Sequence, residues 1–136
     1  MLLALVSGMH DVRGLPVLIV EDDPASARLM SVVLATEGCD VRVAASAEQG
    51  LDILHAFPVR VIVLDLVLPR MSGLLFARQL KEVPATRDIV IIAVTFMSGA
   101  DAERVILEAG CDSYLRKPID TVNLVRTVAR AVRADS

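Results

Sequence analysis

The sequence predicts an α/β domain in which helices cover both faces of a five-stranded parallel sheet. Short apolar runs alternate five times with longer segments of helical period along the chain. Three of the runs consist almost entirely of aliphatic and β-branched residues, which is typical of strands buried on both faces. Five consecutive strand–helix units imply right-handed crossovers, with helices on both sides of the sheet. The 136 residues are enough for one such domain with a substantial core.

The predicted strands follow the apolar runs. They occupy residues 16–20, 40–44, 59–65, 88–94 and 113–117. The first, third and fourth read PVLIV, VRVIVLD and DIVIIAV, and these are the three strongly aliphatic runs. The second and fifth read DVRVA and SYLRK, so they contain more polar residues.

The predicted helices lie between and after these strands. They occupy residues 24–37, 47–56, 73–82, 101–109 and 121–133. Pro24 suits a first helical turn, while Ser46 and Asp120 suit N-cap positions. Gly38 and Gly110 follow two of the expected ends. In the last helix one apolar stripe is expected, and the arginines fall on another face. The stripe consists of Val122, Val125, Ala129 and Val132.

Composition excludes several classes of protein. The net charge is −3 and the chain has one tyrosine and no tryptophan, which argues against nucleic-acid binding by this domain. No apolar run approaches the ~20 residues of a membrane helix. The initial apolar run, residues 1–6, has no basic residue before it, so it does not resemble a signal peptide, and we expect a cytoplasmic protein. Residues 1–14 are expected to be a loosely ordered extension, with Met9 as an alternative start, and residues 15–134 the domain.

Cysteines and histidines give no sign of a zinc site or a disulfide. Cys39 and Cys111 each follow a helix and precede a strand, in the similar segments EGCDV and AGCDS. We expect two small buried side chains in turns rather than a bonded pair. His10 and His55 are isolated in the sequence and are expected on the surface.

Polar residues gather at the carboxyl ends of four predicted strands. Glu21, Asp22 and Asp23 follow the first strand, and Asp65 ends the third. Thr95 follows the fourth strand, and Lys117 ends the fifth. The carboxyl ends of parallel strands share one edge of an open sheet, where ligands bind in the crevice outside them. Each feature alone fits an ordinary loop, helix cap or turn, but their common position predicts a single site.

Asp65 is the most unusual member of this group. It lies within the segment VIVLDLVLPRMSG, where apolar residues flank it on both sides. An ionised carboxylate is costly to bury unless a partner compensates its charge. Crowded carboxylates need a cation, and oxygen ligands suit Mg²⁺. A carboxylate beside Mg²⁺ can attack phosphorus and form an aspartyl phosphate. Lys117 would neutralise the phosphoryl oxygens, and Thr95 would donate a hydrogen bond to one of them.

The chain resembles the receiver domain of two-component response regulators. The segments VLIVEDD, VIVLDLVLPRMSG, IIAVT and YLRKP match the four signature blocks of that family in order, across residues 16–133. The segment GCDSYLRKPI is similar to single-domain receivers of the cell-cycle type. The resemblance implies a flavodoxin-like (CheY-like) sheet in the strand order 2-1-3-4-5. It also implies a signalling protein rather than a classical enzyme, with only self-phosphorylation and slow autodephosphorylation.

The resemblance assigns expected roles to the site residues. Asp65 would accept a phosphoryl group from a histidine kinase or a histidine phosphotransfer protein. Asp22, Asp65 and the backbone carbonyl of Val67 would ligate Mg²⁺, and Glu21 would act largely through bound water. Asp23 matches no functional position of the family and is expected to be a solvated residue or a helix cap.

The resemblance also implies how the signal would leave the domain. Tyr114 occupies the position of the family's switch aromatic, and it would turn inward when Thr95 moves toward the phosphoryl group. A hydrogen bond to a charged group, about 1.5–3 kcal/mol, can shift a balanced two-state equilibrium about tenfold or more. The 101–133 face would then present an altered surface to a downstream protein target, and it is the expected face of any homodimer.

One departure from the family concerns the rim of the site. Phe96 follows the strand-four threonine, where the family usually has a small residue, and Val67 and Met97 are apolar at positions that usually help to orient the hydrolytic water. One hypothesis is that Phe96 narrows the entrance and slows phosphate loss. The alternative is that Phe96 turns aside and packs on a helix.

Three other functions compete with phosphoacceptance. A degenerate receiver could act as an unphosphorylated binding module, although such proteins usually lack a site residue and all are present here. A phosphatase of the haloacid dehalogenase type needs a second acid where this chain has Val67. A flavodoxin would hold phosphate in the loop after the first strand, and here the acids of that loop, residues 21–23, would repel it.

Overall fold

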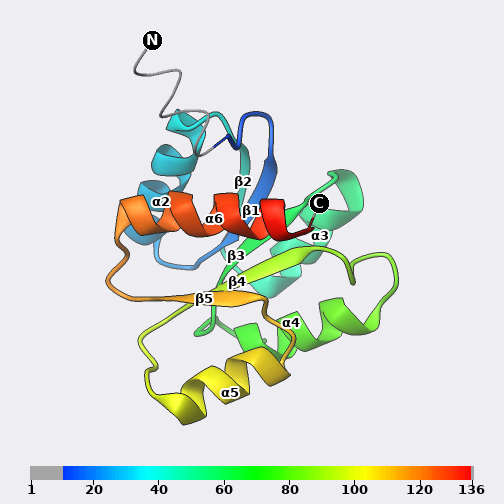
Figure 1. The fold of residues 1–136 in the computed structure, drawn as a ribbon. Coiled ribbons are helices and arrows are strands. Elements are labelled where there is room, and N and C mark those ends of the chain that lie inside the picture. Colours follow the sequence, from blue (N-terminus) through cyan, green and yellow to red (C-terminus); the bar gives the residue numbers. More distant parts are fainter. Residues whose placement is uncertain (1–10, 136) are drawn as a thin grey trace.

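The structure is a computed structural model that describes residues 11–135, with side chains described to residue 133. Its centre is a parallel sheet with the strand order β2-β1-β3-β4-β5 (Figure 1). The strands are β1 (Pro16–Val20), β2 (Asp40–Ala44), β3 (Val61–Asp65), β4 (Val90–Thr95) and β5 (Ser113–Arg116). Every neighbouring pair is parallel, so the predicted fold class and strand order are confirmed.

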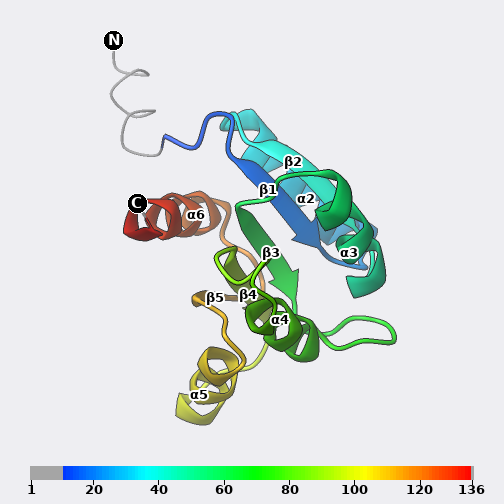
Figure 2. The ribbon, with the colours of Figure 1, turned by 90° about the vertical axis from the view of Figure 1, so that its right-hand side faces the viewer.

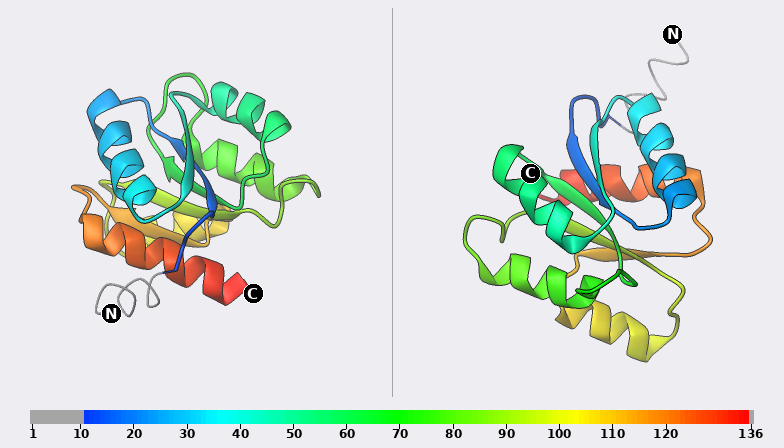
Figure 3. Two further views of the ribbon diagram at one scale, coloured as in Figure 1. Left: turned by 90° about the horizontal axis from the view of Figure 1, so that it is seen from above. Right: turned by 180° about the vertical axis from the view of Figure 1, so that it is seen from behind.

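Helices cover both faces of the sheet. They are α2 (Pro24–Thr36), α3 (Ala47–Ala56), α4 (Gly73–Glu82), α5 (Ala100–Glu108) and α6 (Thr121–Asp135). Helices α2 and α6 lie on one face, and α3, α4 and α5 lie on the other (Figures 2 and 3). Side-chain caps fix several starts, because Ser46 Oγ accepts a hydrogen bond from Gln49 N and Ser72 Oγ accepts one from Leu75 N.

The core consists of two apolar layers, one on each face of the sheet. Strands β3 and β4 are buried at every residue, as their aliphatic sequences predict. Alternate residues of the strands point to opposite faces, so each layer receives half of each strand. On one face Met30, Leu34 and Leu124 pack against the sheet, and on the other face Phe76 and Ile106 do so.

The predicted boundaries differ from the structure by one or two residues at some ends. Strands β3 and β4 begin at Val61 and Val90, in each case two residues later than predicted. These two residues pair with each other. In α6 the residues of the predicted stripe do not all face the core. Val125 and Ala129 are buried, but Val122 is 61% exposed because the buried face centres on Leu124 and Val128.

Part of the predicted N-terminal extension packs against the domain. Residues 1–10, including His10, lie outside the described residues. Val12 is 2% exposed in the core layer of α2 and α6, and Gly14 N donates a hydrogen bond to Gly38 O over 2.7 Å. The packed part of the chain therefore begins before residue 15, the expected start of the domain.

The two cysteines and His55 lie where the sequence predicted them. Cys39 and Cys111 are buried and form no disulfide. Burial raises the pKa of both thiols to about 11. His55 is exposed on α3. Among residues 11–135 the longest apolar helical stretch falls short of what crossing a bilayer requires.

Candidate functional site

The predicted site residues lie together at one edge of the sheet. Glu21 follows β1, Asp65 ends β3, Thr95 ends β4, and Lys117 follows β5. Their side chains line one cavity of about 440 Å³. The cavity is lined by Glu21, Asp22, Asp23, Ser26, Asp65, Val67, Thr95, Phe96, Met97 and Lys117. The strand order produces this arrangement, because β1, β3, β4 and β5 are successive neighbours.

Asp65 is buried but well compensated. The residue is 4% exposed, Oδ1 accepts a hydrogen bond from Val67 N over 3.1 Å, and Oδ2 lies 3.1 Å from Lys117 Nζ. A backbone donor and an ammonium group thus replace the water that the carboxylate loses on burial. Each carboxylate oxygen has its own partner, and these two contacts hold the carboxylate in place at the end of β3.

Glu21 is buried with fewer partners. It is 2% exposed, and Oε2 accepts a long hydrogen bond from Asp23 N at 3.3 Å. Oε1 lies 3.5 Å from Lys117 Nζ and makes no hydrogen bond. Burial is the main cause that raises the pKa of Glu21 to about 7, and the neighbouring Asp65 raises it further, against the opposing effects of the Asp23 N–H and of Lys117.

Lys117 is the cation that joins the two buried acids. Burial alone would lower its pKa, but the hydrogen bond and charge of Asp65, together with the charge of Glu21, outweigh burial and raise it. The ammonium group therefore stays charged at neutral pH. The peptide bond between Lys117 and Pro118 is cis.

The acidic residues fit a divalent cation. Glu21, Asp22 and Asp65 each offer a carboxylate oxygen, and these oxygens all lie within 4.8 Å of one another. Glu21 Oε1 is a buried oxygen without a hydrogen bond, and a cation would satisfy it. An all-oxygen set with access to solvent through the exposed Asp22 suits a hard ion that keeps several waters, such as Mg²⁺.

Thr95 closes the cavity on the side of β4. The residue is 3% exposed, and Oγ1 accepts a hydrogen bond from Met97 N over 2.9 Å. The hydroxyl hydrogen remains available for a second partner in the cavity.

A sequence model of the response regulator receiver domain matches residues 17–129. The chain belongs to this family. Receiver domains are signalling modules of two-component systems rather than classical enzymes.

Relatives of the receiver include both short and long proteins. The polar-differentiation response regulator DivK of Brucella ovis is 33% identical, and the match covers 82% of this chain and 91% of DivK. The response regulator PleD of Caulobacter vibrioides is 32% identical over 86% of this chain, which spans only 26% of PleD. A CheY-like response regulator receiver domain protein of Methanospirillum hungatei has a TM-score of 0.81 at 25% identity, covering 90% of this chain and 96% of that one.

Tyr114 of the receiver lies outside the acidic cavity. Its side chain is half-buried on the α5 side of β5, and its hydroxyl donates a long hydrogen bond of 3.4 Å to Glu103 Oε2. The expected switch residue therefore lies on the strand next to that of Thr95, opposite Ala93, and it contacts α5.

An apolar rim surrounds the mouth of the cavity in this receiver. Val67 is 78% exposed, Phe96 is 73% exposed, and Met97 is 40% exposed. The Phe96 ring centre lies 5.4 Å from Lys117 Nζ, within the range of a cation–π contact. Of the two expectations for Phe96, the structure agrees with a ring at the entrance and not with a ring packed on a helix.

Two further residues near the site, Gly73 and Ser26, were not predicted to contribute to it. Gly73, the first residue of α4, has no space for a side chain, because a Cβ would contact Asp65 O and lie 2.6 Å from Leu66 Cα. A glycine at a helix start directly after the LPRMS segment was the available signal.

Ser26 lines the cavity from α2, and its N–H and hydroxyl both donate to Asp23 Oδ2. Asp23 is thus the N-cap of α2, as one of the two expectations had it.

Proposed function

We propose that Asp65 accepts a phosphoryl group from a phosphohistidine of a histidine kinase or a histidine phosphotransfer protein. The observation that carries this proposal is the placement of the Asp65 carboxylate, which lies between Lys117 Nζ at 3.1 Å and the acidic pair formed by Glu21 and Asp22. Family membership supports the same assignment, because receivers act in two-component signalling. An acid that was only a structural ion-pair partner would not need two further carboxylates within reach.

The transfer needs little covalent work from the protein. An Asp65 oxygen forms a bond to phosphorus, the nitrogen–phosphorus bond of the donor breaks, and the electron pair returns to the donor imidazole, which takes up a proton. Lys117 holds positive charge beside the phosphoryl oxygens, and the Thr95 hydroxyl donates a hydrogen bond to one of them.

We propose Mg²⁺ as the metal, held by Asp22 and Asp65 directly and by Glu21 largely through water, with the Val67 carbonyl as a further ligand. When bound, the ion would neutralise the negative charge shared by the carboxylates and the incoming phosphoryl group. Without it, the negative charge of the carboxylates would oppose the approach of a phosphate; the charge of Asp65 already adds to the burial that raises the pKa of Glu21 to about 7.

Metal binding can be measured without any transfer reaction. Thermal unfolding in EDTA and in excess Mg²⁺ should differ for the wild-type chain, because a ligand that binds only the folded state raises its stability. Asp22→Asn should lose most of this difference. Asp23→Asn is the matched control: Asp23 caps α2 and asparagine also caps well, so its response to Mg²⁺ should persist. Equal responses of the two variants would contradict the ligand assignment.

We propose that phosphorylation changes the surface formed by α5, β5 and α6, the residues 101–133. Thr95 would turn from Met97 N toward the phosphoryl group, and Tyr114 would leave Glu103 and move into the space beside Thr95. The long 3.4 Å bond to Glu103 is a weak restraint on Tyr114, which supports such a movement. A downstream protein target, or a second copy of the chain, would bind the altered surface.

Acetyl phosphate with Mg²⁺, followed by intact-mass measurement, tests the phosphoacceptor. The wild-type chain should gain the mass of one phosphate, and Asp65→Asn should gain none. Asp88→Asn, which changes an exposed aspartate outside the site, should gain phosphate as the wild type does. No gain in the wild type would favour the alternative function, an unphosphorylated binding module.

A further inference from the structure

An apolar groove lies between α2 and α6, the two helices that cover the same face of the sheet. Its volume is about 450 Å³, and no described residue lines both this groove and the acidic cavity. We call it the helix groove. It is lined by Val32, Val33, Thr36, Glu37, Thr121, Val122 and Val125.

Each helix contributes valines to the helix groove. Val32 on α2 is 53% exposed and Val122 on α6 is 61% exposed, whereas Val33 is half-buried and Val125 is buried. Leu29, which is also exposed, lies three residues before Val32 and so extends the same face of α2. Neighbouring exposed apolar side chains on a folded domain often mark a surface that another segment covers.

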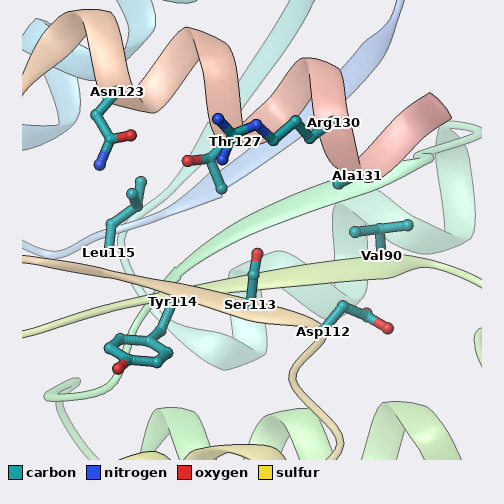
Figure 4. A pocket seen from close by; sticks show the side chains of 9 residues that line it. All are labelled: Val90, Asp112, Ser113, Tyr114, Leu115, Asn123, Thr127, Arg130 and Ala131. Atoms are coloured by element: carbon teal, nitrogen blue, oxygen red, sulfur yellow. The ribbon is translucent and has the colours of Figure 1, made fainter. Parts of the chain in front are cut away.

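Polar and charged groups are few in the helix groove. The Thr36 hydroxyl already donates a hydrogen bond of 2.7 Å within α2. Glu37, at the end of α2, is the only charged residue of the lining among the described residues. The other side of α6 is polar, because Asn123, Thr127 and Arg130 line a cavity between α6 and β5 (Figure 4). An apolar, uncharged occupant therefore fits the α2 side of α6.

The described chain begins beside one end of the helix groove (Figure 1). Val12 is buried in the core layer that α2 and α6 cover. Gly14 N donates a hydrogen bond of 2.7 Å to Gly38 O, and a Cβ at Gly38 would lie 2.9 Å from Arg13 Cγ. Gly38 directly follows Glu37, which lines the groove. Residues 1–10 are thus attached to the domain at the Glu37 end of the groove.

The sequence before this attachment point is apolar. Residues 1–6 read MLLALV, and residues 1–9 contain no charged side chain. Ser7 and Gly8 follow this run, and a Ser-Gly pair is typical of a turn. Residues 7–10 can span about 13 Å, and six residues span about 9 Å as a helix or about 20 Å extended, whereas Val32 to Glu37 covers about 8 Å of α2. The run is long enough to reach the groove and fill it.

We propose that residues 1–6 bind the helix groove of their own chain. Their apolar side chains pack against Val32, Val33, Val122 and Val125, because burial removes both apolar surfaces from water. The attachment favours this occupant over a free one, since a short flexible linker gives an effective concentration in the millimolar range. While the run is bound, another protein reaches Val32 and Val122 only by displacing it.

A tryptophan in the run reports its surroundings, because the chain has no tryptophan of its own. Leu2→Trp and Leu3→Trp are made as separate variants, since adjacent residues of an extended chain point to opposite sides. In at least one variant the indole should emit at shorter wavelength than in a peptide of residues 1–10 with the same substitution. Acrylamide should quench it severalfold less than in that peptide.

The measurements use the full chain without phosphorylation, because α6 belongs to the surface that phosphorylation is proposed to change. Dilution of the protein should leave the shielding of the indole unchanged, as expected for a contact within one chain.

Variants of the helix groove test the contact surface. Val32→Asp and Val122→Asp each place a charge at an exposed position, so the domain should still fold, while the groove becomes unfavourable for apolar side chains. Either substitution should raise the quenching of the indole to nearly that of the peptide. Leu75→Asp is the matched control: Leu75 is exposed in the first turn of α4, as Val122 is in the first turn of α6, and it does not line the groove. Its quenching should stay low.

The wild-type chain provides a second measurement that needs no substitution. With leucine and valine methyl groups labelled, nuclear Overhauser effects should connect residues 1–6 with Val32 or Val122. Their absence would overturn the proposal. So would an indole that is quenched as in the peptide in both tryptophan variants, or equal effects of Val122→Asp and Leu75→Asp. Shielding that is lost on dilution, together with a dimer in sedimentation, would assign the run to the groove of a second copy instead.

Discussion

The backbone of Gly73 lies directly against the backbone of Asp65. Gly73 N donates a hydrogen bond of 3.1 Å to Leu66 O, and a Cβ at Gly73 would contact Asp65 O and lie 2.6 Å from Leu66 Cα. The neighbouring atoms are main chain, so they cannot turn aside as a flexible side chain would. The start of α4 therefore helps to fix the position of the carboxylate at the end of β3.

Gly73→Ala should both destabilise the protein and disturb the site. The added methyl group forces α4 away from β3, at a cost of about 1–3 kcal/mol in the free energy of unfolding, as for other overpacked cores. Urea unfolding measures the loss, and phosphate gain from acetyl phosphate should become slower because Asp65 shifts. Gly50→Ala is the control, because the atom nearest to its added Cβ would be Phe76 Cζ, at 3.4 Å. Equal stability losses in both variants would contradict the argument.

The buried Glu21 should make the metal-free protein less stable as the pH rises. Burial and the neighbouring Asp65 raise the pKa of Glu21 from 4.5 to about 7, so the folded protein binds this proton more tightly than the unfolded chain does. The resulting stability is present below pH 4.5 and is lost as the pH rises through about 7. The loss is at most roughly 3 kcal/mol, from 1.36 kcal/mol per pKa unit.

Urea unfolding in EDTA between pH 4.5 and pH 8 measures this effect. Lys117, whose pKa is raised above 10.5, stays charged throughout that range. Glu21→Gln should reduce the fall in the free energy of unfolding, whereas Glu82→Gln, an exposed control, should not. An unchanged fall in Glu21→Gln would show that the Glu21 proton is not responsible.

Lys81 connects three segments at the amino ends of the strands, on the side of the sheet away from the acidic cavity. Its Nζ donates hydrogen bonds to Ile89 O at 2.7 Å, Arg87 O at 3.2 Å and Asp112 Oδ2 at 3.2 Å. It thereby joins α4, the loop before β4 and the turn before β5. Lys81→Met keeps the aliphatic contacts and removes these bonds, and should lower the free energy of unfolding by about 1–2 kcal/mol.

Arg78→Met is the matched variant for this experiment. Arg78 lies on the same helix and is exposed, so the substitution should change the free energy of unfolding by less than about 0.5 kcal/mol. If the two variants unfold at the same urea concentration, the hydrogen bonds of Lys81 contribute no net stability.

The sequence predicted the sheet and the members of the acidic cavity because both follow from local patterns. An aliphatic run such as Val61–Asp65 is buried on both faces wherever it lies in a parallel sheet, and polar residues after such runs meet at one edge. The strand order came from the family resemblance, since alternation alone does not say which strand is central.

Features that depend on contacts between distant segments were not predicted. The outward position of Val122 follows from how α6 rests on the sheet and against α2, which helical period does not determine. The need for glycine at position 73 follows from the close approach of α4 to β3. The direction of the Phe96 ring depends on side-chain torsions and on Lys117, so the sequence left two alternatives.

Phe96→Ala should shorten the lifetime of the phosphorylated protein. The Phe96 ring lies at the mouth of the acidic cavity beside Lys117, and with Val67 and Met97 it forms an apolar rim that gives an attacking water no hydrogen-bond partner. Removal of the ring opens the entrance to water, so phosphate release after loading with acetyl phosphate should become severalfold faster. Leu75→Ala, which removes an exposed apolar side chain on α4, should leave the rate unchanged. An unchanged rate in Phe96→Ala would mean that water reaches the phosphoryl group by a route the ring does not cover.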